Sequence, residues 1–273
     1  MAASIRLALA KSITMDLRGR EGRNLLAVGV YGSVARGEER RHSDIDLLVM
    51  VRRKSPRIHH EVRDRIVATI LQQTVEDAKS EVTGSRQDLN AILGGWTSLK
   101  PLYDPTGILQ RLRARARRAS PRQFREAAYW ACLEAYEDVG KLWNAIEARD
   151  MDEAREMAIW FTGAAAGALL DLHGHVLKTG RRAIVEASRF GTVGQAVLRL
   201  RYDALSFTEM GRLSEIVWAG LLDVAAKRGI RLPLLRRTLA DPRKGAAPVR
   251  ASPSGFPKVP LASSATSPRI RSP

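Results

Sequence analysis

Cysteine is nearly absent from this sequence, and so is any long apolar run. Cys132 is the only cysteine in 273 residues, which excludes an internal disulfide and a thiolate metal cluster. Its neighbours are apolar and at helical spacing, so we expect a buried thiol. The longest apolar run, residues 157–170, is rich in Ala and Gly and too short to span a bilayer comfortably. We therefore expect no membrane span.

The N-terminal residues do not have the pattern of a signal peptide. The first residues include Lys and Arg, but they lack a sustained apolar stretch and a clear cleavage site. We therefore expect a first helix here and a cytoplasmic protein.

Acidic residues are in the minority, and the net charge is +16. Such an excess predicts an anionic partner, which could be a nucleotide, a nucleic acid or an acidic surface. Part of the charge is local, because seven arginines fall within residues 111–125 and six Lys or Arg against one Asp within 241–273. Arginines at every second position surround a helix, so we interpret 111–125 as a solvated helix. Nucleic acid stays open as a partner, although no RNA-binding module is evident.

Two different patterns divide the chain. Up to about residue 118, short apolar runs typical of strands alternate with helical segments; the predicted strands are 25–31, 44–51, 81–83 and 101–103, and the longest predicted helix is 58–79. From Pro121 to about Leu232, apolar residues recur at three- and four-residue steps. After Pro242 the chain is mostly Pro, Ser, Ala and Arg, which indicates disorder. The predicted fold is α+β, with a mixed head (1–118), an all-α body (119–235) and a basic tail (236–273).

The most specific pattern contains two carboxylates. Asp44 and Asp46 are two residues apart on a predicted strand, so both side chains should leave the same face. Two neighbouring carboxylates repel each other, and a divalent cation relieves this repulsion. Mg²⁺ favours a few carboxylates together with phosphate oxygens and water. The pair therefore predicts a metal site suited to phosphoryl or nucleotidyl transfer.

A glycine-serine turn precedes this pair and provides groups that bind phosphate. Gly32 allows close backbone approach, and Ser33 adds a hydroxyl and an amide at the start of a short helix. Arg36 is one turn further along and carries a forked donor. Gly37 should end the helix, and Ser43 should brace the entry to the aspartate strand. We predict that Gly32, Ser33, Arg36 and Ser43 bind a nucleotide.

The order of strand, Gly-Ser, short helix, Arg-Gly and Ser-Asp-x-Asp resembles the nucleotidyltransferase superfamily typified by DNA polymerase β. The match covers Tyr31 to Met50. It is most similar to the minimal and the aminoglycoside (kanamycin-type) nucleotidyltransferases. The helical body loosely resembles the substrate-binding domain that follows the head in kanamycin-type enzymes. This resemblance implies a mixed-sheet head with Asp44 and Asp46 as catalytic metal ligands.

The family usually adds a third carboxylate on a neighbouring strand, and this sequence offers three candidates. Glu81 is our choice as the third catalytic acid, because it lies in the plausible strand downstream. Asp88 is an alternative, but Ser85-x-x-Asp88 also has the spacing of a capping box. Asp77 should lie on a helix. If none of the three serves, full catalytic competence is in question.

Other titratable residues have simpler interpretations. Glu134, Asp138 and Lys141 share one helical face that could meet an acceptor, although Glu137 and Lys141 also fit an ordinary surface ion pair. The histidine pairs His59-His60 and His173-x-His175 do not have the spacing of a metal site, so we expect surface or capping roles.

The resemblance implies transfer of a nucleoside monophosphate, AMP from MgATP, to an acceptor hydroxyl, with release of pyrophosphate. Mg²⁺ is the expected cofactor and Mn²⁺ a possible substitute. The acceptor stays open between a small molecule and a protein, as in minimal nucleotidyltransferases that act as antitoxins on a toxin partner. The Arg and His motif of such toxins is not evident here. A regulatory nucleotide-binding module without turnover is the other alternative.

Overall fold

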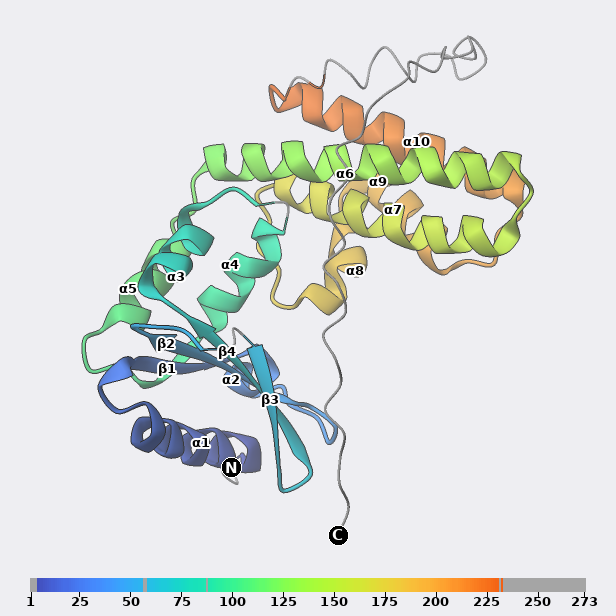
Figure 1. Ribbon diagram of the computed structural model, residues 1–273. Helices are drawn as coiled ribbons and strands as arrows, with labels where there is room; N and C mark the ends of the chain where they lie inside the picture. Colours follow the sequence, from blue (N-terminus) through green and yellow to red (C-terminus); the bar gives the residue numbers. More distant parts are fainter. Residues whose placement is uncertain (1–3, 56–57, 87, 231, 233–273) are drawn as a thin grey trace, which may run out of the picture. The chain divides into compact units, whose positions relative to one another are not determined.

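The computed structural model describes residues 4–55, 58–86, 88–230 and 232. Its first half is a sheet with helices on both faces, and its second half is helical (Figure 1). The strands are β1 (Leu25–Tyr31), β2 (Ile45–Val51), β3 (Ile58–Arg63), β4 (Ile66–Gln73) and β5 (Lys100–Tyr103). The helices around them are α1 (Ile5–Glu21), α2 (Gly32–Arg36), α3 (Val75–Thr83), α4 (Leu89–Ser98) and α5 (Ile108–Ala116), with a 3₁₀ turn at Gly22–Asn24. The α+β prediction is confirmed.

The five strands form one mixed sheet in the order β3-β4-β2-β1-β5. The β2–β4 pair is parallel, and the other neighbours are antiparallel. One face packs on α1, through buried residues such as Ile13, Leu17 and Leu47. The other face packs on α3, α4 and α5, through residues such as Leu48, Leu93 and Leu109. The strand β2 lies in the middle of the sheet and is therefore buried on both sides.

The helix predicted over residues 58–79 is wrong. This segment is the hairpin β3–β4 followed by α3. Val62, Ile66 and Ile70 are four residues apart, a spacing that fits both a helix and one face of a strand. The turn residues Asp64 and Arg65 both have positive φ, which is the backbone of a two-residue hairpin turn. Since neither is Gly or Asn, the sequence lacked the usual turn signal.

The strand predicted over residues 81–83 is also wrong. These residues form the last turn of α3, which begins with a capping box between Thr74 and Asp77. The sequence cue for the start of the helix was therefore present, but the wrongly predicted helix obscured it. The capping box expected at Ser85 is absent, because Asp88 is the N-cap of α4 and makes no side-chain hydrogen bond to that helix.

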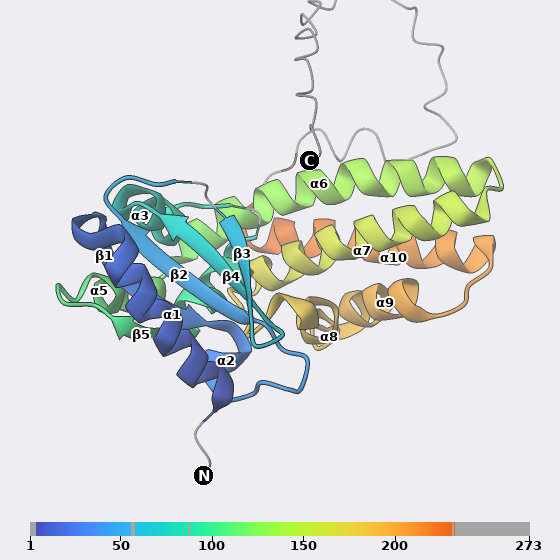
Figure 2. The same ribbon diagram turned by 60° about the horizontal axis from the view of Figure 1, so that its bottom comes forward.

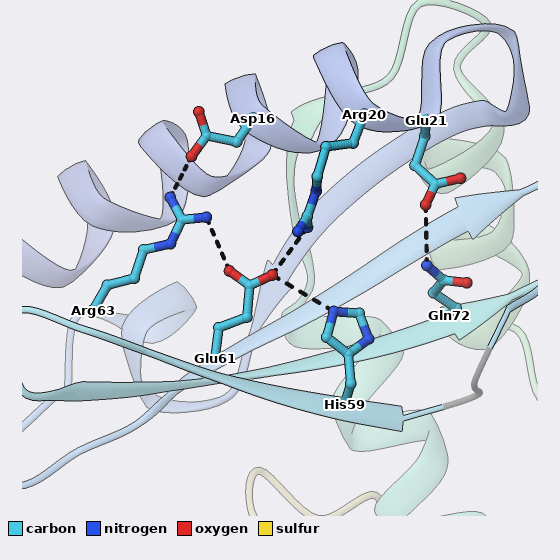
Figure 3. Close-up of polar contacts among 7 residues, drawn as sticks. All are labelled: Asp16, Arg20, Glu21, His59, Glu61, Arg63 and Gln72. Atoms are coloured by element: carbon cyan, nitrogen blue, oxygen red, sulfur yellow. Dashed lines mark hydrogen bonds and ion pairs between the residues drawn. The ribbon is translucent and has the colours of Figure 1, made fainter. Parts of the chain in front are cut away.

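The edge strand β3 is held to α1 by ion pairs (Figure 3). Glu61 accepts hydrogen bonds from Arg20 and Arg63, both at 2.9 Å, and Arg63 also pairs with Asp16. His59 lies on the same side, with its Nε2 3.7 Å from Glu61. Alternate residues of β3 therefore face α1, and those between them face the other side of the sheet.

The helical body packs against the head. Its helices are α6 (Pro121–Glu147), α7 (Met151–Leu172), α8 (Ala183–Ala187), α9 (Gly191–Tyr202) and α10 (Phe207–Lys227), with a 3₁₀ turn η2 (Gly180–Arg182). The long helices α6, α7 and α10 run side by side (Figure 2). The apolar run within α7 is a core helix as predicted, and Cys132 on α6 is a free, fully buried thiol.

Asn90 and Asp171 connect the head to the body in a buried contact. Asn90 on α4 donates a hydrogen bond of 2.9 Å to Asp171 Oδ1 on α7. Asp171 is only 1% exposed, and its second oxygen has no hydrogen-bond partner. Burial raises the pKa of Asp171 to about 8. The junction therefore contains a carboxyl group that the fold favours in its protonated form.

The described residues up to Leu232 form one compact unit. The division into domains at residues 118 and 119 stays a prediction, and the predicted disordered tail at 236–273 lies outside the described residues. In the part of the chain that the structure describes, no helix is long and apolar enough to cross a membrane.

The pH dependence of stability should depend on Asp171. Its folded pKa, about 8, exceeds the unfolded value of about 3.9. Its contribution to stability is therefore present below the unfolded pKa and lost as pH rises through 8. Asp171→Asn keeps the shape of the side chain without its charge. At pH 9 its free energy of unfolding should therefore exceed that of the wild type by about 1–3 kcal/mol.

Urea denaturation at pH 5 and pH 9 measures this difference. Asp223→Asn, on an exposed residue paired with Lys227, is the matched control and should follow the wild type at both pH values. Parallel stability changes in the wild type and Asp171→Asn would contradict the assignment.

Candidate active site

Asp44 and Asp46 lie at the beginning of β2, and both are half-buried. Asp46 is the register partner of Tyr31, the last residue of β1 before α2. Burial, followed by the charge of Asp44, raises the pKa of Asp46 to about 6, while Arg181 and Arg36 act in the opposite direction. Such a pair is stabilised by a bound proton or a bound cation.

Gly32 lies directly against Asp46. Its φ is 70°, in the left-handed region, and a Cβ at this position would overlap Asp46 Oδ2. Only glycine lets the backbone adopt this conformation and come this close to the carboxylate. Ser33 follows it as the second residue of α2, so the Gly-Ser turn lies next to the Asp46 carboxylate.

Arg36 is held in place by two contacts. Its Nε donates to Glu38 Oε2 at 2.7 Å, and its Nη1 donates to the carbonyl of Lys178 at 3.0 Å. The side chain therefore joins the Gly-Ser loop to the segment after α7, and its charge still reaches Asp46. Gly37 ends α2 in the left-handed conformation with φ 69°, as predicted.

Ser43 stabilises the loop that leads into β2. Its hydroxyl accepts a hydrogen bond of 2.9 Å from the backbone N–H of Arg40, and its carbonyl accepts one of 2.7 Å from Arg6 Nε. These contacts keep the chain in place just before Asp44. A direct contact between Ser43 and a nucleotide stays a prediction.

Glu81 reaches the neighbourhood of the carboxylate pair from α3 rather than from a strand. It lines an apolar cavity of about 280 Å³ together with Tyr31 and Trp96. Burial, followed by the charges of Asp46, Glu81 and Asp44, raises the pKa of Tyr31 to about 12. The fold therefore gathers three carboxylates around one phenol, although Glu81 approaches from a different element than expected.

The strand next to Asp46 has no carboxylate on the face that Asp46 occupies. Asp46 is the register partner of Thr69 on β4. The residues of β4 on that face are Val67, Thr69, Leu71 and Gln73, and none of them is acidic. The resemblance implies a third acid on a neighbouring strand, and β4 provides a threonine opposite Asp46.

Sequence reasoning missed a basic segment that comes from the helical body. Residues 178–182 read Lys-Thr-Gly-Arg-Arg, and their charges act on groups of the head. The charge of Arg181 opposes the rise in the pKa of Asp46. The pKa of Glu38 is lowered mainly by Arg36, and Lys178 and Arg182 lower it further. The available signal was three basic residues around a glycine between two helices, but nothing in the sequence placed them near Asp46.

A second cavity, of about 460 Å³, opens between α4, α6 and α7. We call it the Glu134 cavity. Small residues of α7 such as Gly163 and Gly167 leave the space, and Asp88 and Glu134 give it two carboxylates. Trp160 lines it while 59% exposed. Ala91 lines both this cavity and the apolar cavity beside Tyr31. Gly180 and Ala183, on either side of the Arg181–Arg182 pair, also line the Glu134 cavity.

The acidic residues of α6 differ in their surroundings. Burial raises the pKa of Glu134, and Asp138 and Asp88 add to that effect. Burial also raises the pKa of Asp138. Glu137 pairs with Lys141 at 2.7 Å on the surface, as the simpler interpretation expected. Glu134 is therefore an α6 carboxylate that lines the cavity and has a raised pKa.

Known proteins resemble this chain in both sequence and fold. The family model described as "Nucleotidyltransferase domain" matches residues 17–83. An aminoglycoside nucleotidyltransferase (4′) from Bacillus sp. is 21% identical over 246 residues, covering 85% of this chain and 94% of the relative. Residues 17–83 are thus similar to a nucleotidyltransferase domain, and most of the chain is similar to an aminoglycoside nucleotidyltransferase.

A nucleotidyltransferase-like protein from Exiguobacterium sibiricum shares the superfamily fold. Its crystal structure has a TM-score of 0.55 at 11% identity, over 80% of this chain and 77% of that chain. The family model and the Bacillus relative support nucleotidyl transfer as the general class of reaction. In the described residues, no group of three or more His, Cys, Asp or Glu could hold a metal ion.

Adding a methyl group at Gly32 should disable the site without unfolding the chain. Gly32→Ala displaces Asp46, so we expect pyrophosphate release to fall about 100-fold or more, as misplaced catalytic groups do. Gly37→Ala is the matched control, because Gly37 has a similar φ of 69° but open space around its Cβ position. It should cost roughly 1 kcal/mol of stability and little activity. Equal activity loss in the two variants would contradict this role of Gly32.

Proposed function

We propose that the chain transfers AMP from MgATP to a hydroxyl group of a cationic small molecule and releases pyrophosphate. The observation that carries this proposal is the contact between Gly32 and Asp46. It brings a Gly-Ser turn against a carboxylate that is already next to Asp44. Binding of a triphosphate and of a cation on one wall is what nucleotidyl transfer requires.

The carboxylate pair fits a divalent cation. Asp46 is half-buried and its pKa is raised, mainly by burial and then by Asp44, so a positive charge between the two would relieve both effects. Asp44 and Asp46 would hold Mg²⁺, with Mn²⁺ as a substitute, and phosphate oxygens and water would complete the set. When bound, the ion supplies charge neutralisation for the triphosphate.

The triphosphate would lie between the Gly-Ser turn and residues 178–182. Gly32 and Ser33 offer backbone N–H groups, and Ser33 adds its hydroxyl. Arg181 carries a positive charge that reaches Asp46, and it would neutralise the phosphates from the opposite side. Arg36 supports this arrangement by linking the two segments through the Lys178 carbonyl.

The acceptor would occupy the Glu134 cavity. The segment that carries Arg181 borders both this cavity and the carboxylate pair, which supports an acceptor position next to the triphosphate. Asp88 and Glu134 favour a cationic acceptor even though the chain as a whole is basic. The exposed face of Trp160 suits stacking against a sugar ring. The Bacillus relative supports the same class, since its name specifies aminoglycosides.

Removal of either central carboxylate should abolish transfer. Asp44→Ala and Asp46→Ala should each lower pyrophosphate release from MgATP by about a thousandfold, because the lost charge stabilisation is several kcal/mol. Asp203→Ala, on an exposed residue paired with Arg199, is the control and should keep wild-type rates. Release that persists in both site variants would overturn the proposed function.

The identity of the acceptor can be tested with aminoglycosides that have or lack a free 4′-hydroxyl. We expect pyrophosphate release only with the former, and Glu134→Gln should raise the KM for the acceptor about tenfold with little change in kcat. Glu126→Gln, on the same helix but in an exposed pair with Arg122, is the matched control. Labelling of lysate proteins by ATP, with no transfer to aminoglycosides, would favour a protein acceptor instead.

A further inference from the structure

Four side chains form a row across the catalytic face of the sheet. Tyr31 on β1 is the register partner of Asp46 on β2, which is the partner of Thr69 on β4, which is the partner of His60 on β3. The ring of His60 is fixed by a contact of 3.2 Å between its Nδ1 and Thr69 Oγ1. His60 thus lies two strands from Asp46, roughly 10 Å along the backbone.

The two consecutive histidines of β3 face opposite sides of the sheet. His59 faces α1 and pairs with Glu61 (Figure 3). His60 faces the side of Asp46 and is exposed. The dipeptide, which the sequence alone assigned to the surface, therefore places one imidazole beside the active site and the other in a structural ion-pair network.

No charged side chain of β3 or β4 shares the face of His60. Its neighbours on these strands are Ile58, Val62, Val67 and Leu71, besides Thr69. Along the row, the nearest ionisable groups are the carboxylates at the start of β2 and the arginines that act on them, Arg36 and Arg181. Thr69, between Asp46 and His60, is the shortest side chain of the row.

We propose that His60 is the proton acceptor of the transfer reaction, with Thr69 as its positioning residue. This proposal rests on the proposed function. The Nε2 of His60 takes the proton of the acceptor hydroxyl while the hydroxyl oxygen forms a bond to the α-phosphorus of ATP. The bond from that phosphorus to the bridging oxygen breaks, and its electron pair leaves with pyrophosphate. The proton stays on the imidazolium until it passes to solvent.

The chemistry of the row favours this assignment. An imidazole accepts protons near neutral pH, which suits a general base. The strand beside Asp46 provides threonine instead of an acid, so a base on this face must come from elsewhere. His60 is the next side chain in the row, and the Thr69 hydroxyl selects its orientation.

Alanine variants of the two histidines provide a matched pair. Pyrophosphate release is measured with MgATP and an aminoglycoside bearing a 4′-hydroxyl. His60→Ala should lower kcat by about 100-fold or more, the usual contribution of a general base, with little change in the KM for ATP. Added imidazole should restore part of the rate. His59→Ala should stay within about threefold of the wild type and should not respond to imidazole.

Three outcomes overturn the assignment: equal kcat in the two histidine variants, a loss in His60→Ala that imidazole does not restore, or a change confined to KM. Thr69→Val, which removes the anchor but keeps the shape, should lower kcat by a smaller factor. Asp46→Asn tests the proposed function separately. Unchanged release in Asp46→Asn overturns that function, whereas unchanged release in His60→Ala alone overturns only the role of His60.

Discussion

The repulsion between Asp44 and Asp46 is the interaction on which the rest of the site depends. The fold places both carboxylates at the start of a central strand, with Asp46 half-buried and pressed against Gly32. Such an arrangement costs free energy unless positive charge is near. Arg36 and Arg181 supply part of it from two different elements. A bound cation, together with its triphosphate, would balance the negative charge of the two carboxylates that these arginines leave uncompensated.

The head and the helical body form one unit, and two polar connections join them near the site. Arg36 holds the carbonyl of Lys178, so the loop that follows α7 is tied to the Gly-Ser turn. Asn90 and Asp171 make a second, buried connection between α4 and α7. Together they keep Arg181 near the carboxylates and the Glu134 cavity open beside them. The body thus contributes to the charge balance of the site as well as its walls.

The β3–β4 hairpin shows where sequence reasoning failed and why. Its apolar residues are spaced by four, which is close to one helical turn and also twice the strand repeat. Its turn uses Asp64 and Arg65 at positive φ, where Gly or Asn would have signalled a hairpin. The error had a functional consequence. As a helix, the segment could not place Thr69 and His60 in register with Asp46, so both were overlooked.

The sequence by itself determined the local chemistry of residues 32–46. The positive φ at Gly32 and Gly37 and the spacing of the aspartates are properties of short segments, and local residue types carry them. It also determined the α+β class and the buried state of Cys132. Only the tertiary structure decided that Glu81 approaches from a helix, that Thr69 stands next to Asp46, and that Arg181 arrives from the body. These contacts join residues far apart in the chain, and their geometry follows from sheet register and helix packing, which no local pattern encodes.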